Sequence, residues 1–493
     1  MLGGVELSSR MKIVGAAFRR WFGGFRVAYL PVLLTYLCFG ASMVTSIALL
    51  YFEKDRLGLT PGEAAGIAFW LGLPWSMKMV VGVASDVRPI FGSRRGAYLI
   101  VGALCSLGGY AALATTVRSK AAYLAAVLLV TIGYMVQDVV ADALSVEIAR
   151  NDEEIGQIQT LGRMATLAGG IAVGLPSGWL VAVLGPRGVF ACAMTLPIVV
   201  ALSVAFLPRW RDAPPVAAQA TAGVLGGGRT RLVLLAGLGY AALGVGLEMS
   251  GIAWAQEIVL VVSAALLSFL LMRMGVTRAV LVAALVIFIF RATPDVGQGY
   301  SYWAIDRLGF DERFLGLLAQ VSSVLGLIGL LVFRRTIVER PVSFTLFWVI
   351  VAGTILYLPN IGLFYGLQDW LGISARSLAL IDTTISAPLN QLAMVPMLVL
   401  IAKTAPRGGE ATMFAIMASL MNLALSASQL FTRYLNEGFA VSQHDYGNLG
   451  RLMVTVGAIG LVPLLALPLL WREERAGPIT AAASTPQPVV SRP

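Results

Sequence analysis

The sequence is poor in charge. Only 13% of its 493 residues are Asp, Glu, Lys or Arg, whereas about 25% are charged in an ordinary soluble domain. Hydrophobic residues make up 58% of the chain, and the mean hydropathy is +0.82. A water-soluble protein cannot hide this much apolar surface, because its own exterior must be polar. The composition therefore excludes an ordinary soluble enzyme and favours an integral membrane protein.

Residues that bind metals or form disulfides are also few. The three cysteines, Cys38, Cys105 and Cys192, each lie in an apolar run without a nearby partner, so we interpret them as buried hydrophobic residues. The one histidine, His444, lies beside Asp445 in a loop-like stretch, and a single histidine makes a poor metal site. We expect no disulfide framework, no metal and no other cofactor.

Common catalytic and nucleotide-binding signatures are missing from the sequence. It contains no GxxxxGK[ST] phosphate loop, no HExxH and no GxSxG. We therefore expect neither an enzyme nor an ATPase domain, and energy must come from an ion gradient, a substrate gradient or another subunit. The net charge of +10 could indicate nucleic acid, but in a membrane protein excess Lys and Arg mark cytoplasmic loops. We expect no nucleic-acid partner.

Apolar runs of about 20 residues predict spanning helices, because every backbone polar group in a bilayer must be satisfied inside its own segment. We expect an all-α polytopic protein with fourteen transmembrane helices. The first six are predicted near 27–50, 64–85, 96–116, 121–147, 158–184 and 188–207. Two more follow near 232–252 and 255–272, and the last six near 279–303, 313–333, 342–362, 377–402, 411–435 and 452–471.

The pattern six, two, six suggests two similar halves with an insertion. We predict an N-terminal six-helix half over 1–208, a cytoplasmic linker with two extra helices over 209–277, a C-terminal half over 278–475 and a disordered tail over 476–493. With the N-terminus inside, about 22 Lys and Arg residues lie in cytoplasmic segments against about 10 outside. This bias predicts a multi-pass protein of the cell's inner membrane with both termini cytoplasmic.

A basic loop follows the second predicted helix. Gly82, Asp86, Gly92, Arg94 and Arg95 resemble the signature loop of the major facilitator superfamily. The equivalent place in the second half keeps little beyond Arg334 and Arg335.

The acidic and basic residues of this loop can form a hydrogen-bonded cluster that closes the cytoplasmic side. The predicted inner gate comprises Lys78, Asp86, Arg94, Arg95, Glu147 and Arg150. Lys78 lies inside an apolar helix, so it should face a partner carboxylate, a cavity or the interface. The alternative is that these charges only anchor the topology.

A longer set of residues resembles the folate–biopterin transporters of the major facilitator superfamily. It comprises Lys54-Asp55, Leu57 to Pro61, Pro74-Trp75, Lys78, Gly82, Ser85-Asp86, Pro89, Gly92, Arg94-Arg95 and Tyr98, then Asp138, Asp142, Ala143, Glu147 and Arg150, and late in the chain Glu410 to Thr412, Phe414 and Ser419 to Asn422. Met79 and Ser93 depart from the family pattern, which commonly has proline and an aromatic residue there. The resemblance implies a secondary transporter that moves folate- or pterin-like anionic solutes by alternating access with proton coupling. Its partners would then be that small molecule, protons and the lipid bilayer.

The fourth predicted helix carries two carboxylates in its apolar run. Asp138 and Asp142 are four residues apart, hence on one face of a helix. Two carboxylates this close should not both ionise easily, so one is a candidate proton site. A carboxylate could also accept both N–H donors of the 2-amino-4-oxo edge of a pterin. Alternatively, both aspartates pair with Lys78 or Arg163 and only hold helices together.

The first helix of the second half contains a buried arginine and helix breakers. Arg291 lies 13 residues beyond Arg278, or about 20 Å deep at 1.5 Å per residue. It could bind an anionic substrate bidentately, or Asp295 could neutralise it. Pro294 and Gly297 weaken the helix, and interrupted helices often border transport sites.

Other polar and small residues in the predicted spans give further expectations. Asn390 and Asn422 are candidate cavity-lining amides. Tyr300, Tyr302 and Trp303 fit an aromatic belt at the outer interface. Gly170, Gly174 and Gly178 recur every four residues and should allow a close helix contact.

Three alternatives to a folate or pterin transporter remain open. One is a carrier of the same superfamily for a sugar, a muropeptide or another organic solute. Another is a non-transporting membrane receptor, although the chain has no appended soluble domain to signal with. The third is a membrane-embedded enzyme, for which no catalytic constellation is visible.

Overall fold

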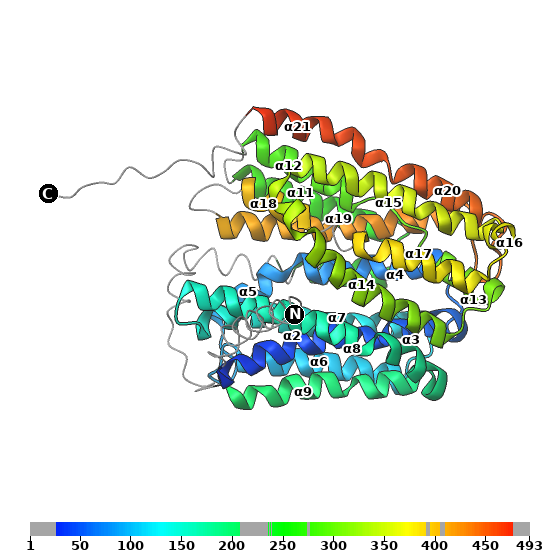
Figure 1. The fold of residues 1–493 in the computed structure, drawn as a ribbon. Helices are drawn as coiled ribbons and strands as arrows, with labels where there is room; N and C mark the ends of the chain where they lie inside the picture. Colours follow the sequence, from blue (N-terminus) through cyan, green and yellow to red (C-terminus); the bar gives the residue numbers. More distant parts are fainter. Residues whose placement is uncertain are drawn as a thin grey trace, which may run out of the picture.

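The computed structural model describes residues 26–207, 235, 237, 239–273, 277–390, 395–404 and 410–476. Within these ranges the regular structure is entirely helical, and no β-strand occurs. The predicted linker and the tail from residue 477 lie outside the described residues. Figure 1 shows the helices running side by side along one common direction. An all-helical protein is the expected form for a chain whose backbone must be satisfied within a bilayer.

The first half of the described chain contains helices α2 to α9. They are α2 (Leu30–Ala41), α3 (Ser46–Tyr51), α4 (Pro61–Ser76), α5 (Lys78–Val87), α6 (Gly96–Thr115), α7 (Lys120–Ile148), α8 (Asp152–Ala193) and α9 (Thr195–Ser203). Short 3-10 turns and a π-helical segment η3 (Phe52–Arg56) make residues 27–56 one continuous span. Helix α8 bends at Gly185, which has a φ of 68° and precedes Pro186. The continuous helical stretch Glu153–Phe206, which includes α8 and α9, therefore contains two predicted spans.

The second half and the inserted region contain helices α11 to α21. They are α11 (Ala255–Arg273), α12 (Arg278–Arg291), α13 (Gln298–Leu308), α14 (Glu312–Glu339), α15 (Val342–Phe364), α16 (Leu367–Leu371), α17 (Ala375–Asn390), α18 (Val395–Thr404), α19 (Glu410–Gly438), α20 (Leu449–Ile459) and α21 (Leu467–Arg475). Before them, residues 239–249 are helical as well, where the first extra helix is predicted.

Seven helical stretches in the described chain are long and apolar enough to cross a membrane, or eight if the bent pair α4 and α5 counts as one span. This supports a multi-pass membrane protein. The count of fourteen stays a prediction, because several predicted spans are broken. For example, α12 and α13 have 14 and 11 residues, and neither crosses about 30 Å of hydrocarbon alone at 1.5 Å per residue.

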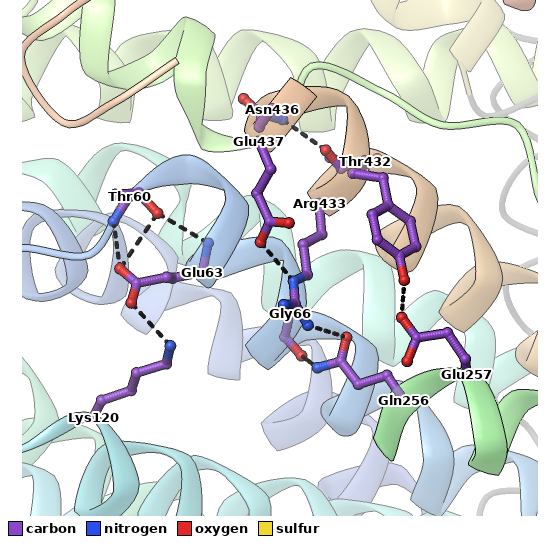
Figure 2. A network of polar contacts seen from close by, with 11 residues as sticks. Thr60, Glu63, Gly66, Lys120, Gln256, Glu257, Thr432, Arg433, Asn436 and Glu437 are labelled. Atoms are coloured by element: carbon purple, nitrogen blue, oxygen red, sulfur yellow. Dashed lines mark hydrogen bonds and ion pairs between the residues drawn. The ribbon is translucent and has the colours of Figure 1, made fainter. Parts of the chain in front are cut away.

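Helix α4 begins where the sequence places a helix start. The Glu63 amide donates to Thr60 Oγ1 at 3.2 Å, and the Thr60 amide donates to Glu63 Oε2 at 3.0 Å. This reciprocal capping box satisfies amides that the first turn leaves without partners. Figure 2 shows the pair together with Lys120, whose Nζ lies 3.0 Å from Glu63 Oε1.

The two halves meet along two helix pairs. Figure 1 shows α2, α6, α8 and α9 on one side, α12, α15, α20 and α21 on the other, and α4 and α14 between them. Helix α4 packs on α19, and α8 packs on α14. Each half also has its own apolar cluster, one around Val32, Leu99 and Val140 and one around Ile287, Leu346 and Met417.

Glycines on α8 allow its close approach to α14. A Cβ added at Gly178 would lie 2.0 Å from the Glu312 carbonyl oxygen, and one at Gly174 would lie 2.7 Å from Gln320 Cα. Gln320 Oε1 also accepts from the Leu175 amide at 3.0 Å. The predicted small-residue contact is therefore confirmed at Gly174 and Gly178.

Candidate functional site

The first span of the second half is interrupted in its middle. Helix α12 ends at Arg291, α13 begins at Gln298, and residues 292–297 between them are not helical. Pro294 has no amide to donate to a helix, and Gly297 has a φ of 62° and a ψ of −150°, which few residues other than glycine adopt. The break predicted from Pro294 and Gly297 is confirmed.

Helix α19 supplies partners for the backbone of this break. Ser428 Oγ donates to the Thr293 carbonyl at 2.8 Å, Thr432 Oγ1 accepts from the Asp295 amide at 3.0 Å, and Asn436 Nδ2 donates to the Val296 carbonyl at 3.2 Å.

The three α19 residues are spaced by four, so they form a polar stripe on one helix face. An unwound backbone at membrane depth is tolerated where protein groups satisfy it. These side chains therefore stabilise the non-helical backbone of the break.

A cavity of about 760 Å³ lies beside the break. Residues 293–298 form one wall, α4 another, and α15 and α20 much of the remainder, which is completed by Glu53, Phe290, Leu389, Gln429 and Pro463. Its volume is in the range of sites for small organic molecules, about 300–1,000 Å³. Broken helices that line a cavity at mid-depth are typical of substrate sites in transporters.

The charged groups on the cavity wall are acidic. Glu53 and Asp295 line it, whereas no Lys, Arg or His does so among the described residues. Asp295 Oδ1 accepts from the Gly297 amide at 2.6 Å, which fixes the carboxylate, and the Asp295 side chain is otherwise exposed. The cavity therefore suits a group rich in hydrogen-bond donors.

Aromatic and amide side chains also contribute polar groups to the wall. Tyr300, Tyr357 and Asn360 line the cavity, and Asn360 Nδ2 donates to Asp382 Oδ2 at 2.9 Å. The predicted aromatic belt is wrong here. Tyr302 is fully buried, Trp303 is 6% exposed and Tyr300 lines the cavity, because α13 packs in an apolar cluster with residues of α14, α15, α17 and α20.

Arg291 ends α12 at the edge of the break. It is partly buried, its Nε has no hydrogen-bond partner, and no ion pair joins it to Asp295 within the described chain. Asp295, considered above as its counter-ion, bonds instead to Gly297 and Thr432. A guanidinium held away from carboxylates is available to an anion.

Helix α7 carries the two predicted aspartates, and each contacts a different helix. Asp138 Oδ2 forms an ion pair with Lys78 Nζ of α5, and that ammonium also lies 4.8 Å from the centre of the Trp75 ring. Asp142 Oδ1 accepts a hydrogen bond from the Tyr36 hydroxyl of α2 and is solvent-accessible. Lys78 therefore pairs with Asp138, whereas the sequence analysis predicts it in the inner gate.

The predicted charge cluster of the inner gate forms around Arg95. Its Nη2 lies 2.6 Å from Asp86 Oδ1 and 2.7 Å from Glu147 Oε1, and its Nη1 donates to Ser85 Oγ at 2.6 Å. The cluster joins α5, α6 and α7. Arg94 is buried beside it, whereas Arg150 is exposed and its amide donates to Glu154 Oε2 at 2.5 Å.

Of the two amides predicted to line a cavity, only Asn422 has a described side chain, and it is not among the residues that line the cavity beside the break. Asn422 Nδ2 of α19 donates to the Trp75 carbonyl at 3.0 Å, at the place where α4 gives way to α5 with a bend of 41°. Helix α19 therefore contacts the broken spans of both halves. The side chain of Asn390 lies outside the described residues.

A polar contact joins the halves at the end opposite the inner gate. Lys54 Nζ lies 2.6 Å from Asp306 Oδ1, and Tyr446 Oη donates to Asp306 Oδ2 at 2.7 Å. The Gln443 amide group also donates to the Lys54 carbonyl. We call these residues the outer contact. The outer contact therefore links η3 to α13.

Helix α11, which lies where the sequence predicts an insertion, contacts both α4 and α19. Gln256 Nε2 donates to the Gly66 carbonyl of α4 at 3.0 Å, and Gln256 Oε1 accepts from Arg433 Nη1 of α19 at 3.2 Å. Figure 2 shows this bridge and the adjoining Arg433–Glu437 pair. The extra helix therefore clamps α4 to α19.

Sequence reasoning missed several residues of the site. The stripe Ser428, Thr432 and Asn436 has a signal in its spacing of four within an apolar helix. Glu53 was placed in a loop because the first span was predicted to end near residue 50, whereas it continues to Arg56. Its burial could not be predicted, because it depends on α7 and α13 from distant parts of the chain.

Comparison with known proteins gives a consistent result. A sequence model of the BT1 family matches residues 40–482. The chain is 29% identical to a folate-biopterin transporter of Synechocystis over 90% of this chain and 81% of that one. It is 23% identical to folate transporter 2 of Plasmodium falciparum over 92% of this chain and 90% of that one.

Solved structures share the fold. A mutant of the peptide transporter POT in complex with sulfate has a TM-score of 0.63 at 17% identity, covering 93% of this chain and 96% of that one. A mutant of the nucleoside transporter NupG has a TM-score of 0.61 at 12% identity, covering 90% and 100%. These likenesses show a transporter fold and say nothing about cargo.

Proposed function

Because this membrane transporter belongs to the BT1 family, we propose that it moves folate- or pterin-like anionic solutes by alternating access, coupled to protons. The observation that carries the proposal is the broken span α12–α13, which lines a cavity of about 760 Å³ between the halves. The relatives named for folate and biopterin transport support this choice of cargo. The resemblance inferred from the sequence alone is the same family.

The proposed motion rocks residues 1–208 against residues 278–475. The outer contact joins the halves through Lys54 and Asp306, and α8 meets α14 at Gly178 on the same side. The charge bias of the loops favours an orientation in which this side faces the outside and both termini are cytoplasmic. The membrane that we propose for the protein is the cell's inner membrane. The conformation described here is then closed to the outside.

The proposed roles follow from charge and position. Arg291 would bind the anionic end of the cargo, and the cavity carboxylate of Asp295 would accept the donor edge of the heterocycle. Asp138 and Asp142 would serve as proton or heterocycle-binding groups, with Asn390 and Asn422 along the path. Asp86, Arg94, Arg95, Glu147 and Arg150 would form the inner gate, with Lys78 linking it to Asp138.

Uptake of radiolabelled folate into proteoliposomes, with and without an inward proton gradient, tests the proposal. Saturable uptake that rises with the gradient supports it, and uptake that ignores the gradient removes proton coupling. Uptake no greater than in protein-free vesicles, from protein shown to be folded, rejects folate as cargo. Competition with unlabelled pterins, sugars and muropeptides then identifies the solute that this cavity accepts.

A further inference from the structure

Glu53 is a buried carboxylate at the end of the first span. It lies in the π-helical segment η3 (Phe52–Arg56), where it is 8% exposed. The Tyr123 hydroxyl of α7 donates to its Oε1 at 2.7 Å. Its Oε2 has no hydrogen-bond partner in the described part of the chain, and the residue lines the cavity beside the helix break.

No ion pair joins this carboxylate to a cation within the described part of the chain, and Arg56 of the same segment is exposed. The neighbouring Lys54 is committed to Asp306 at 2.6 Å, and Lys120 pairs with Glu63 at 3.0 Å. The titratable and charged groups on the segment of Glu53 are Lys54, Asp55 and Arg56. Those near it on α4, α7, α13 and the cavity wall include Glu63, Lys120, Tyr123, Asp295, Tyr300, Tyr302, Asp306 and Tyr357.

An ionised carboxylate that is buried with one neutral donor is strongly disfavoured. A protonated carboxyl avoids this cost and can itself donate from its second oxygen. Carboxylates inside a membrane protein commonly mark proton pathways for this reason. Resting on the proposed function and deepening it, we propose that Glu53 is a proton-carrying group of the transport cycle, additional to the α7 aspartates.

The position of Glu53 couples its protonation to the outer contact. Glu53 and Lys54 are consecutive in η3, one facing the cavity and the other pairing with Asp306. Separation of Lys54 from Asp306 hydrates η3 from the outside, and a hydronium ion transfers a proton to the carboxylate and becomes water. The neutral side chain is then buried as the outer contact closes. When the cavity next opens to the inside, water reaches Glu53 and takes the proton as hydronium, and the carboxyl returns to the ionised form.

Glu53→Gln mimics the permanently neutral state. In proteoliposomes we expect substrate counterflow to persist, because it requires no net proton movement, while accumulation driven by an inward proton gradient falls to an inside-to-outside ratio of about one. Asp55→Asn is the matched control, since Asp55 lies in the same segment, its side chain is 52% exposed, and its 3.6 Å contact with Lys54 is longer than the 2.6 Å contact that Asp306 makes. Gradient-driven accumulation by Glu53→Gln at the level of Asp55→Asn would overturn the proposal.

A second measurement needs no variant and no transport. Dicyclohexylcarbodiimide reacts with a protonated carboxyl in an apolar site: the carboxyl proton goes to one carbodiimide nitrogen, the oxygen bonds to the central carbon, and the adduct rearranges to a stable N-acylurea. We expect peptide mass spectrometry of the wild-type protein to find Glu53 labelled more at about pH 6 than at about pH 8. Equal labelling at both values, or none, would overturn the proposal even if folate proves to be the wrong cargo.

Discussion

The Lys54 ammonium lies 2.6 Å from the Asp306 carboxylate, and this ion pair joins the end of the first span to α13 across the two halves. The Lys54 side chain is only 4% exposed, so its charge is balanced by Asp306 rather than by water. Removing one partner of a largely buried pair costs about 3–5 kcal/mol. In the proposed cycle, the conformation closed to the outside therefore depends on this contact.

The first prediction concerns this pair. We expect Asp306→Asn to lower transport at least about 10-fold, because each 1.4 kcal/mol taken from a required state is a factor of ten in its population. Exchanging the charges in a Lys54→Asp, Asp306→Lys double variant should recover part of the loss. Lys120→Ala is the control, since its pair with Glu63 is half exposed and is worth about 0–1 kcal/mol. Equal effects of Asp306→Asn and Lys120→Ala on uptake would contradict this role.

A second prediction concerns Asp142, whose carboxylate accepts from Tyr36 and is reached by solvent. We expect Asp142→Asn to abolish concentrative uptake while protein yield and the thermal unfolding midpoint stay close to the wild type. The asparagine keeps the size and the hydrogen bond but cannot bind and release a proton. Uptake against a gradient, measured beside the yield of purified protein, checks this. Full activity in the variant would remove Asp142 from the proton path.

The third prediction uses two glycines of one helix. At Gly178 a Cβ would lie 2.0 Å from the Glu312 carbonyl oxygen, whereas at Gly156 nothing lies within 4 Å. Gly178→Ala should therefore force α8 away from α14 and prevent outer closure. We expect transport to fall at least about 10-fold, with a single introduced cysteine near Lys54 becoming more reactive to a membrane-impermeant maleimide.

Gly156→Ala tests whether any loss at Gly178 is specific. Alanine is favoured over glycine in a helix by about 1 kcal/mol, so this variant should transport normally and unfold at the same or a higher temperature. If both variants lose activity alike, helix flexibility rather than the α8–α14 contact is responsible.

Much of the architecture could be predicted from local sequence. Apolar runs predict spanning helices, Thr60 and Glu63 predict the start of α4, and Pro294 with Gly297 predicts the break after Arg291, since each depends on chemistry within a few residues. The family could also be inferred, because the residues from Pro74-Trp75 to Arg94-Arg95 form a specific local pattern.

Partners across helices could not be predicted in the same way. Whether Lys78 meets Asp138 or the Arg95 cluster depends on how α5 rotates against α7, and the sequence does not contain that angle. The burial of Tyr302 depends on α13 turning inward after the break. Glu53 shows the same limit, since the only described hydrogen bond of its side chain comes from Tyr123, 70 residues away.

The final prediction concerns Arg291, which lies at the edge of the helix break and has no carboxylate partner in the described chain. A guanidinium binds a carboxylate through two parallel hydrogen bonds, which a lysine cannot reproduce. If Arg291 holds the anionic end of the cargo, Arg291→Lys should raise the KM for folate about 10-fold or more, because the bidentate contact is worth at least 1.4 kcal/mol. An uncharged pterin without the glutamate tail has no group for this contact, so its KM should not change. Parallel uptake measurements with both compounds separate the two effects. A similar rise in KM for both would mean that Arg291 supports the fold of the break rather than the anion, and an unchanged KM for both would place the anionic end elsewhere.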